Sequence, residues 1–359
     1  MDTLQFDDST TGLLGEGAQA ISRPRLFLVI AAGCAIAYPW LLWLFSAAAS
    51  LLHVSTPLTS GAIAIGVAMA LAAAWSVMLV CFRLELALGK SGNASPDRRR
   101  AQTIIHLAFA APSMLVGFGN IAGVLHARTA VPVVWPIFWL LIAGASLIMP
   151  KKSTPTPMSP KAQRRLSIAH GISACAIIVL FIAPHIGNHL AGFWNGATHI
   201  MTMTAVRQVY RSEIVEPVLL TLILFQIVSG VVLVRDRIRH RSGMFETLQT
   251  MTGVYVGVYF LAHMTAVFAA RYAGTDTNWN WLTGNGHGML TSLSSIPLVA
   301  HYWVGPVAIF SHVACGLRQA MLQKSVSALM ADRFARTLIG LGALASSVIL
   351  VALLGIAIA

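Results

Sequence analysis

The feature of this sequence that most constrains its fold is a series of nine apolar runs. A transmembrane helix needs about 20 predominantly apolar residues, and every run reaches that length. The runs cover residues 24–52, 58–82, 102–125, 130–149, 166–192, 214–234, 247–270, 293–317 and 335–358. Because 57% of the chain is hydrophobic and only 10% is charged, a water-soluble domain could not bury this apolar surface. The sequence therefore predicts an all-α polytopic membrane protein with nine transmembrane helices.

The Lys and Arg residues between the runs predict how the chain is oriented. With the N-terminus in the cytoplasm, cytoplasmic segments hold 20 of these residues and external loops hold 4, which together make the 24 in the chain. Cytoplasmic loops of membrane proteins carry such an excess of basic residues. We therefore expect a cytoplasmic N-terminus and an external C-terminus, in a bacterial inner membrane. The net charge of +12 then reflects topology and does not indicate a nucleic-acid partner.

A Lys-, Pro- and Ser/Thr-rich linker over residues 150–165 divides the chain into two blocks. Residues 1–23 form a polar cytoplasmic tail, and residues 24–149 form a four-helix transmembrane block whose role the sequence does not indicate. Residues 166–359 form a five-helix block. Most of the intramembrane polar residues lie in this second block, so we expect the chemistry of the protein there.

Two histidines of the second block, His185 and His263, lie at a similar predicted depth. At a rise of about 1.5 Å per residue, His185 lies about 30 Å from the inner edge of its span and His263 about 26 Å from the edge of its own. A buried imidazole is costly in hydrocarbon, so two at one depth suggest a shared partner. We expect that partner to be the iron of a haem b held between two helices. The alternative is that each ring merely hydrogen-bonds within the helix bundle.

A second polar level is predicted nearer the inner edge. His312 lies about 9 Å and Gln226 about 14 Å from the basic residue that ends each span, and His170 lies near the inner end of the fifth span. Glutamine is a poor iron ligand compared with imidazole. This level therefore predicts a His170–His312 haem site, a quinone site or a satisfied polar cluster, and the residues alone leave these alternatives open.

The fifth to eighth spans carry a pattern of basic starts, glycines and late histidines. Its pieces are RRLSIAHGISACAIIVLFIAPHIGNHLAG, YRSEIVEPVLLTLILFQIVSGVVLV, FETLQTMTGVYVGVYFLAHMTAV and HYWVGPVAIFSHVACGL. The pattern resembles the cytochrome b membrane anchor of the succinate dehydrogenase and fumarate reductase superfamily. The resemblance covers approximately residues 164–320, and the first four spans have no counterpart in it.

The resemblance implies that His185 and His263 hold one haem b near the external face. It also implies a second pair of ligand positions. The first of these positions is a histidine in this chain, His312, whereas the second is a glutamine, Gln226. We therefore expect one haem b rather than two. The family's role implies electron exchange with quinone and an anchor for cytoplasmic flavoprotein and iron–sulfur subunits.

The chain itself carries no flavin-binding fingerprint and no iron–sulfur cysteine set. Any dehydrogenase chemistry is therefore expected in separate subunits. Two other classes remain open from the sequence. One is a haem-free membrane scaffold, and the other is a transporter with Glu216, His312 and Gln226 in a polar pathway.

Overall fold

The computed structural model describes residues 22–51, 60–89, 95–149, 157–238, 243–284, 289 and 295–355, with backbone alone for 44–51 and 60–65. Most of the predicted tail at residues 1–23 and the first part of the predicted linker, residues 150–156, thus lie outside the described residues. The helices of the first part are α1 (Arg23–Leu51), α2 (Ser60–Gly89), α3 (Pro96–Phe109), α4 (Ala111–Val124), η1 (Arg128–Ala130) and α5 (Val131–Ile148). Those of the second part are α6 (Pro160–Ile177), η2 (Ile178–Ile182), α7 (Ala183–Ala191), α8 (Gly196–Tyr210), α9 (Val215–Arg237), α10 (Met244–Tyr272), α11 (Trp279–Leu282), α12 (Ile296–Gln323) and α13 (Ala328–Leu353).

The described residues form eight helices long and apolar enough to cross a membrane, and nine spans if one bent pair counts as a single span. The prediction of a polytopic all-α membrane protein is confirmed. The bent pair is α3 and α4, which meet at 66° within the predicted span 102–125. Pro112 explains the break, because it has no N–H to donate and its ring clashes with the carbonyl four residues earlier.

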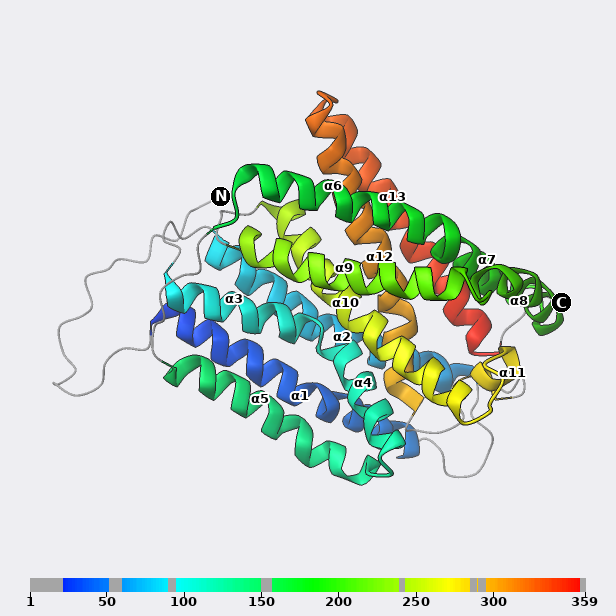
Figure 1. Ribbon diagram of the computed structural model, residues 1–359. Coiled ribbons are helices and arrows are strands. Elements are labelled where there is room, and N and C mark those ends of the chain that lie inside the picture. The colour runs from blue at the N-terminus through cyan, green and yellow to red at the C-terminus, as the bar shows by residue number, and fades with distance from the viewer. Residues whose placement is uncertain are drawn as a thin grey trace.

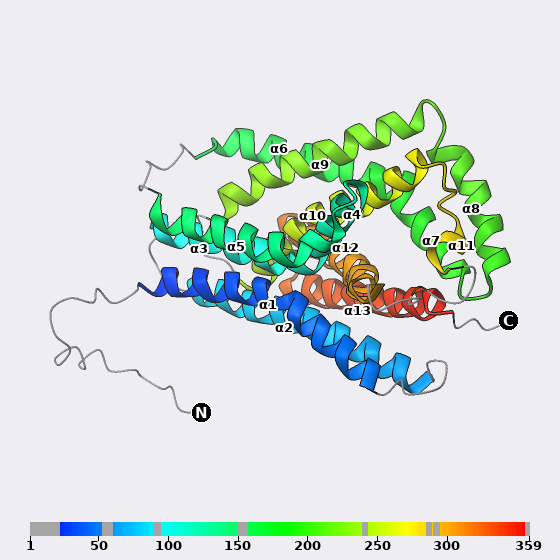
Figure 2. The same ribbon diagram turned by 90° about the horizontal axis from the view of Figure 1, so that it is seen from below.

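The core of the bundle is shared by both blocks of the chain. α4 packs against α10 and α12, while α1 packs against α2, α3 and α5, as Figures 1 and 2 show. One continuous cluster of buried apolar side chains runs from α1 through α5 to α10 and α12, and Trp135 on α5 donates its indole N–H to the carbonyl of Ala35. The four-helix block is therefore integral to the packing of the second block.

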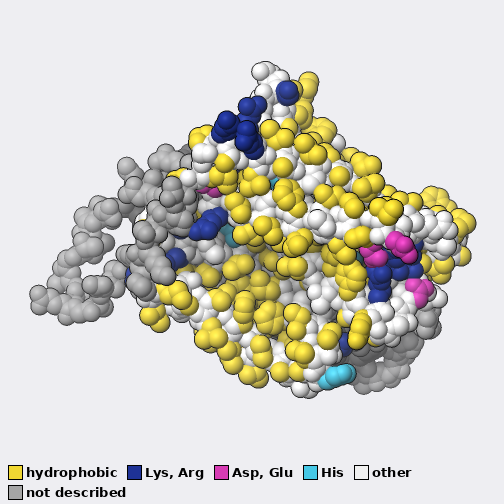
Figure 3. Space-filling model, viewed as in Figure 1, with side chains coloured by type: hydrophobic (Ala, Val, Ile, Leu, Met, Phe, Trp, Pro, Cys, Tyr) yellow, Lys and Arg dark blue, Asp and Glu magenta, His cyan; other side chains and the backbone are white. Residues whose placement is uncertain are grey.

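A second layer of helices covers one side of this core. α6, η2 and α7 form one long span, α6 packs on α9, and α9 packs on α10. η2 is a π-helical turn, a feature that often accompanies functional sites. The outer faces of α6, η2 and α9 expose apolar side chains such as Ile172, Val179 and Val231, and the middle of the face in Figure 3 is covered by hydrophobic side chains. These faces are suited to contact with lipid.

The two ends of the bundle differ in charge. We call the end where α1, α3, α6 and α10 begin the basic end, since it carries Arg98, Arg164 and Arg235, and the opposite end the α8 end. In Figure 3 most Lys and Arg side chains lie toward the basic end, whereas those at the α8 end lie beside Asp and Glu. Consecutive spans run in opposite directions, as the charge count predicts. Which end faces the cytoplasm stays a prediction.

Candidate cofactor site

The span formed by α6, η2 and α7 carries a histidine at each of two levels. His170 lies near the basic end, and His185 lies 15 residues later, about 22 Å along the helix. Each lies beside a histidine from another helix, His312 on α12 and His263 on α10. The structure thus brings together four of the five residues predicted for cofactor binding as two pairs of rings that approach edge to face.

The pair at the basic end consists of His170 and His312, whose ring centres are 6.4 Å apart at an angle of 80°. The Nδ1 atom of His170 lies 2.8 Å from the hydroxyl of Ser229, and that of His312 lies 2.9 Å from the carbonyl oxygen of Gln249. With Nδ1 committed to these bonds, Nε2 is the atom available to a metal on each ring. Histidines that bind metals are oriented in this way by a hydrogen bond at the other nitrogen.

A cavity of about 570 Å³ opens beside these two rings. This volume lies within the roughly 300–1,000 Å³ of cofactor and small-molecule sites. Most of its lining is apolar, and three glycines form part of its wall: Gly230, Gly253 and Gly257. A Cβ atom at Gly253 would lie 2.8 Å from Cε1 of His312, while one at Gly257 would meet nothing within 4 Å. Gly253 therefore makes room for the ring of His312, and Gly257 leaves open space in the cavity.

Gln226 also lines this cavity but is tied to α6. Its amide nitrogen donates to the carbonyl of His170 at 2.6 Å and to the hydroxyl of Ser173 at 2.5 Å. The side chain next to the ring of His312 is therefore the imidazole of His170 and not the amide of Gln226. Gln226 joins α9 to α6 and so holds the backbone that carries His170.

The pair at the α8 end consists of His185 and His263, with ring centres 6.2 Å apart. It forms part of a longer row of rings. His189 lies 4.7 Å from His185, His199 lies 5.3 Å from His189, and His301 lies 6.0 Å from His263. His189, His199 and His301 were not among the residues predicted for the site. Of these three, only His189 could have been assigned to the site from its spacing, because it lies four residues after His185 and residues four apart share a helix face.

The space at the α8-end pair is smaller. The adjoining cavity measures about 140 Å³, and aromatic rings occupy the room around the imidazoles. Phe181 stacks on His185 at 4.9 Å and Tyr259 on His263 at 5.6 Å. Ile223 and Phe260 line both this cavity and the larger one, so the two levels adjoin.

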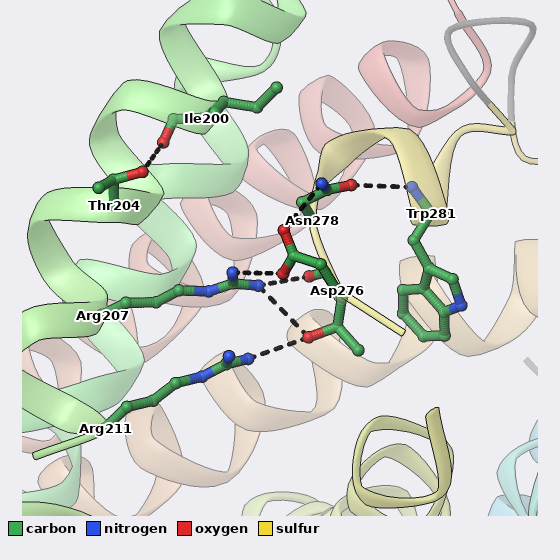
Figure 4. Close-up of polar contacts among 8 residues, drawn as sticks. Ile200, Thr204, Arg207, Arg211, Asp276, Asn278 and Trp281 are labelled. Atoms are coloured by element: carbon green, nitrogen blue, oxygen red, sulfur yellow. Dashed lines mark hydrogen bonds and ion pairs between the residues drawn. The ribbon is translucent and has the colours of Figure 1, made fainter. Parts of the chain in front are cut away.

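Arginines surround the mouth of the smaller cavity. In Figure 4, Arg207 and Arg211 extend from α8 toward the segment before α11, where Arg207 contacts Asp276 and both contact Thr277. The hydrogen bond from Arg207 lowers the pKa of Asp276. Figure 4 also shows Thr204 donating to the carbonyl of its own helix, one turn earlier on α8.

The acid at the start of α9, Glu216, also lies at this mouth. Glu216 pairs with Arg271 at the end of α10. Glu216 thus links α9 to α10. Arg211 is directed instead to the hydroxyl of Thr277, 2.9 Å away.

The packing of α8 is expected to weaken in acid because of His199. Asn188 lies 3.1 Å from Nε2 of this ring, and burial, followed by nearby Arg207, lowers the pKa of His199 to about 4. The pKa of a histidine in the unfolded chain is about 6.5. Between pH 6.5 and 4 the folded state therefore binds fewer protons than the unfolded state, and it loses stability as the pH falls. The loss is on the order of 2 kcal/mol.

Hydrogen exchange of α8, corrected for intrinsic rates, measures this loss. We expect protection to fall between pH 7 and 4.5 in the wild-type protein, and to change less in a His199→Asn variant. Equal protection at both pH values in the wild type would show that His199 does not govern the segment.

The fold and the site define the class of this protein: a polytopic α-helical membrane protein with two levels of paired histidines. Among the described residues, no group of three or more His, Cys, Asp or Glu side chains could hold a metal ion by itself. A metal bound by two histidines needs its remaining ligands from elsewhere, as a porphyrin supplies them. Comparison of this chain with protein-family models, curated proteins and solved structures finds no match.

Proposed function

We propose that this protein binds haem b and transfers electrons within the membrane. The observation that carries the proposal is the pair His170 and His312, whose rings lie edge to face beside the 570 Å³ cavity with Nδ1 of each ring already hydrogen-bonded. Two imidazoles that bind one metal from opposite sides at about 2 Å hold their ring centres roughly 6 Å apart. The distance of 6.4 Å fits that arrangement.

The residues of the cavity fit a flat apolar macrocycle in other respects. Gly257 leaves space along α10, and the walls are built from aliphatic side chains such as Ile177 and Val254. Arg235 and Arg237 lie at the cavity's edge, where guanidinium groups can pair with carboxylates. A bound haem would supply one-electron chemistry, while the helices fix its ligands and its burial.

His185 and His263 remain the ligands that we propose for a haem at the α8 end. Their ring centres, 6.2 Å apart, fit a shared metal as well as those of the first pair. The surrounding cavity is only about 140 Å³, so Phe181 and the neighbouring rings must shift to admit a macrocycle. The geometry therefore favours the basic-end pair as the principal site.

The family resemblance guides the rest of the proposal. We infer a membrane subunit that passes electrons between a donor and the quinone pool, with flavoprotein or iron–sulfur subunits as cytoplasmic partners. The basic end would face the cytoplasm of a bacterial cell, with the C-terminus external. The sequence assigns 20 Lys and Arg residues to the cytoplasmic side and 4 to the external side.

A transporter is the second candidate function. The 66° break between α3 and α4 favours it, since broken helices often form substrate sites in transporters. A scaffold without haem is the remaining alternative.

The absorption spectrum of the purified protein tests the proposal. After expression with an adequate haem supply, the reduced-minus-oxidised difference spectrum should show the α-band of a b-type cytochrome. A wild-type protein that is folded but lacks this band would overturn the proposal in favour of a transporter or scaffold.

A further inference from the structure

A carboxyl group buried in a membrane helix lies close to the larger cavity. Glu85, on α2, is 2% exposed. Its Oε1 atom accepts a hydrogen bond of 2.6 Å from the amide of Gln102, while its Oε2 atom accepts none within the described part of the chain. A buried carboxylate is costly unless it is paired with a positive charge. The Oε2 atom therefore needs a cationic group or a hydrogen-bond donor beside it.

The nearest proton carrier is His106 on α3, which is 3% exposed. Its Nδ1 atom lies 3.8 Å from Oε2 of Glu85 and 2.7 Å from the carbonyl oxygen of Gln102. Because a carbonyl oxygen can only accept, the hydrogen bond to it places a proton on Nδ1. A positive charge on this ring would therefore lie directly beside the carboxylate.

The other ring nitrogen of His106 has a partner that suits either protonation state. Nε2 lies 3.3 Å from the hydroxyl of Thr250 on α10, and this hydroxyl also lies 3.0 Å from the carbonyl of Thr247. When Nε2 is bare, the hydroxyl donates to it. When Nε2 carries a proton, the hydroxyl accepts from it and donates to the carbonyl instead. His106 can thus gain or lose a proton through rotation of one hydroxyl.

This site lies at the wall of the cavity. His106 and Thr250 line it together with His170 and His312. Glu85 lies four residues from the end of α2, about 6 Å from the basic end. A charge on His106 therefore acts on the cavity through a low-dielectric interior, where electrostatic interactions are strong.

We propose that Glu85 and His106 form a proton-loading site coupled to the redox state of a haem held by His170 and His312. This inference rests on the proposed function. When a haem held by these two histidines gained one electron from a donor subunit, Nε2 of His106 would take up one proton from hydronium in the aqueous phase at the basic end, and water would be left behind. The added proton offsets the added negative charge, and Glu85 stabilises the resulting imidazolium.

Other charged groups lie at the same end of the bundle, and the variants leave them intact. Arg98, which is also buried, lies two turns before His106 on α3, and Glu246 on α10 supplies its backbone carbonyl to Thr250. Arg235 and Arg237 on α9 line the same cavity. From α1, Arg25 is paired with Asp97.

Potentiometric titration of the haem-loaded protein between pH 6 and 8.5 tests the coupling. We expect the midpoint potential of the basic-end haem to fall as the pH rises in the wild-type protein, and this slope to be lost in Glu85→Gln and His106→Gln. Glu213→Gln, which changes an exposed carboxylate at the α8 end in the same way, should keep the wild-type slope. Thr250→Val should also change the slope, and it carries the test if the other variants fail to fold.

The outcomes separate this inference from the proposed function. Haem-loaded variants at Glu85, His106 and Thr250 with the wild-type slope would overturn the proton-loading site and leave the haem site standing. A folded wild-type protein without haem would overturn both. A wild-type slope lost equally in Glu213→Gln would also overturn the inference, since the effect would then be one of general charge.

Discussion

Replacing His312 with alanine should remove the haem of the basic-end cavity, and replacing His170 should do the same. Each substitution deletes one of the two rings whose centres lie 6.4 Å apart and opens a gap where the metal bond would form. Loss of a residue that only orients a ligand costs about 10–100-fold in metal affinity, so loss of the ligand itself should cost at least as much. The α-band per mole of protein measures the effect.

The control for these variants is His126→Asn. His126 is an exposed histidine with a φ of 53°, a conformation that asparagine tolerates, and its replacement should leave the α-band unchanged. An undiminished α-band in both the His170 and the His312 variants would contradict the proposed site. If His185→Ala and His263→Ala alone removed the band, the haem would belong to the α8 end.

Replacing Gly257 with phenylalanine should exclude haem from the basic-end cavity without disturbing the fold. A Cβ atom at this position meets nothing within 4 Å, and the residue lines the cavity. The new ring would therefore occupy the space that the macrocycle needs. In a helix interior, phenylalanine also has a higher helix propensity than glycine. We expect most of the α-band to be lost while the melting temperature is kept.

Gly340→Phe is the matched control for this variant. Gly340 lies on α13 and is exposed, and a Cβ atom there would also meet nothing within 4 Å, but the residue lies outside both cavities. This variant should bind haem as the wild type does. Full haem content in Gly257→Phe would mean that the cavity is not where the cofactor lies.

Sequence reasoning predicted the transmembrane architecture because hydrophobicity and charge leave strong local signals. Runs of apolar residues marked the spans, and the alternation of basic and non-basic loops predicts their directions. The break between α3 and α4 was not predicted. Pro112 lies within an unbroken apolar run, and whether a proline kinks or ends a helix depends on what packs around it.

The candidate site was predictable only in part. Counting residues from the basic loops placed His170 and His312 at nearly the same depth, about 8 and 9 Å, yet the sequence could not show whether they share a face. The resemblance directed attention to Gln226 opposite His312, while the structure commits that amide to α6. Spacing along one helix gives depth, but the facing of two rings depends on the rotation and tilt of both helices.

Glu85 and His301 show a second limit. Glu85 lies near the end of an apolar run, where an acidic residue is indistinguishable from one in contact with water. Its burial comes from α3, and that of His301 from α4, through the hydrogen bond between His301 and Ser113. Contacts between helices that are distant in the sequence carry no local signal, so these two side chains could be recognised as buried only from the structure.

An experimental density map of the protein purified with haem would test the central claim most directly. We predict flat density in the cavity between α6, α10 and α12, with its centre bonded to Nε2 of His170 and of His312. Lipid or solvent density in that cavity, with the two imidazoles unbonded in a haem-supplied preparation, would contradict the claim.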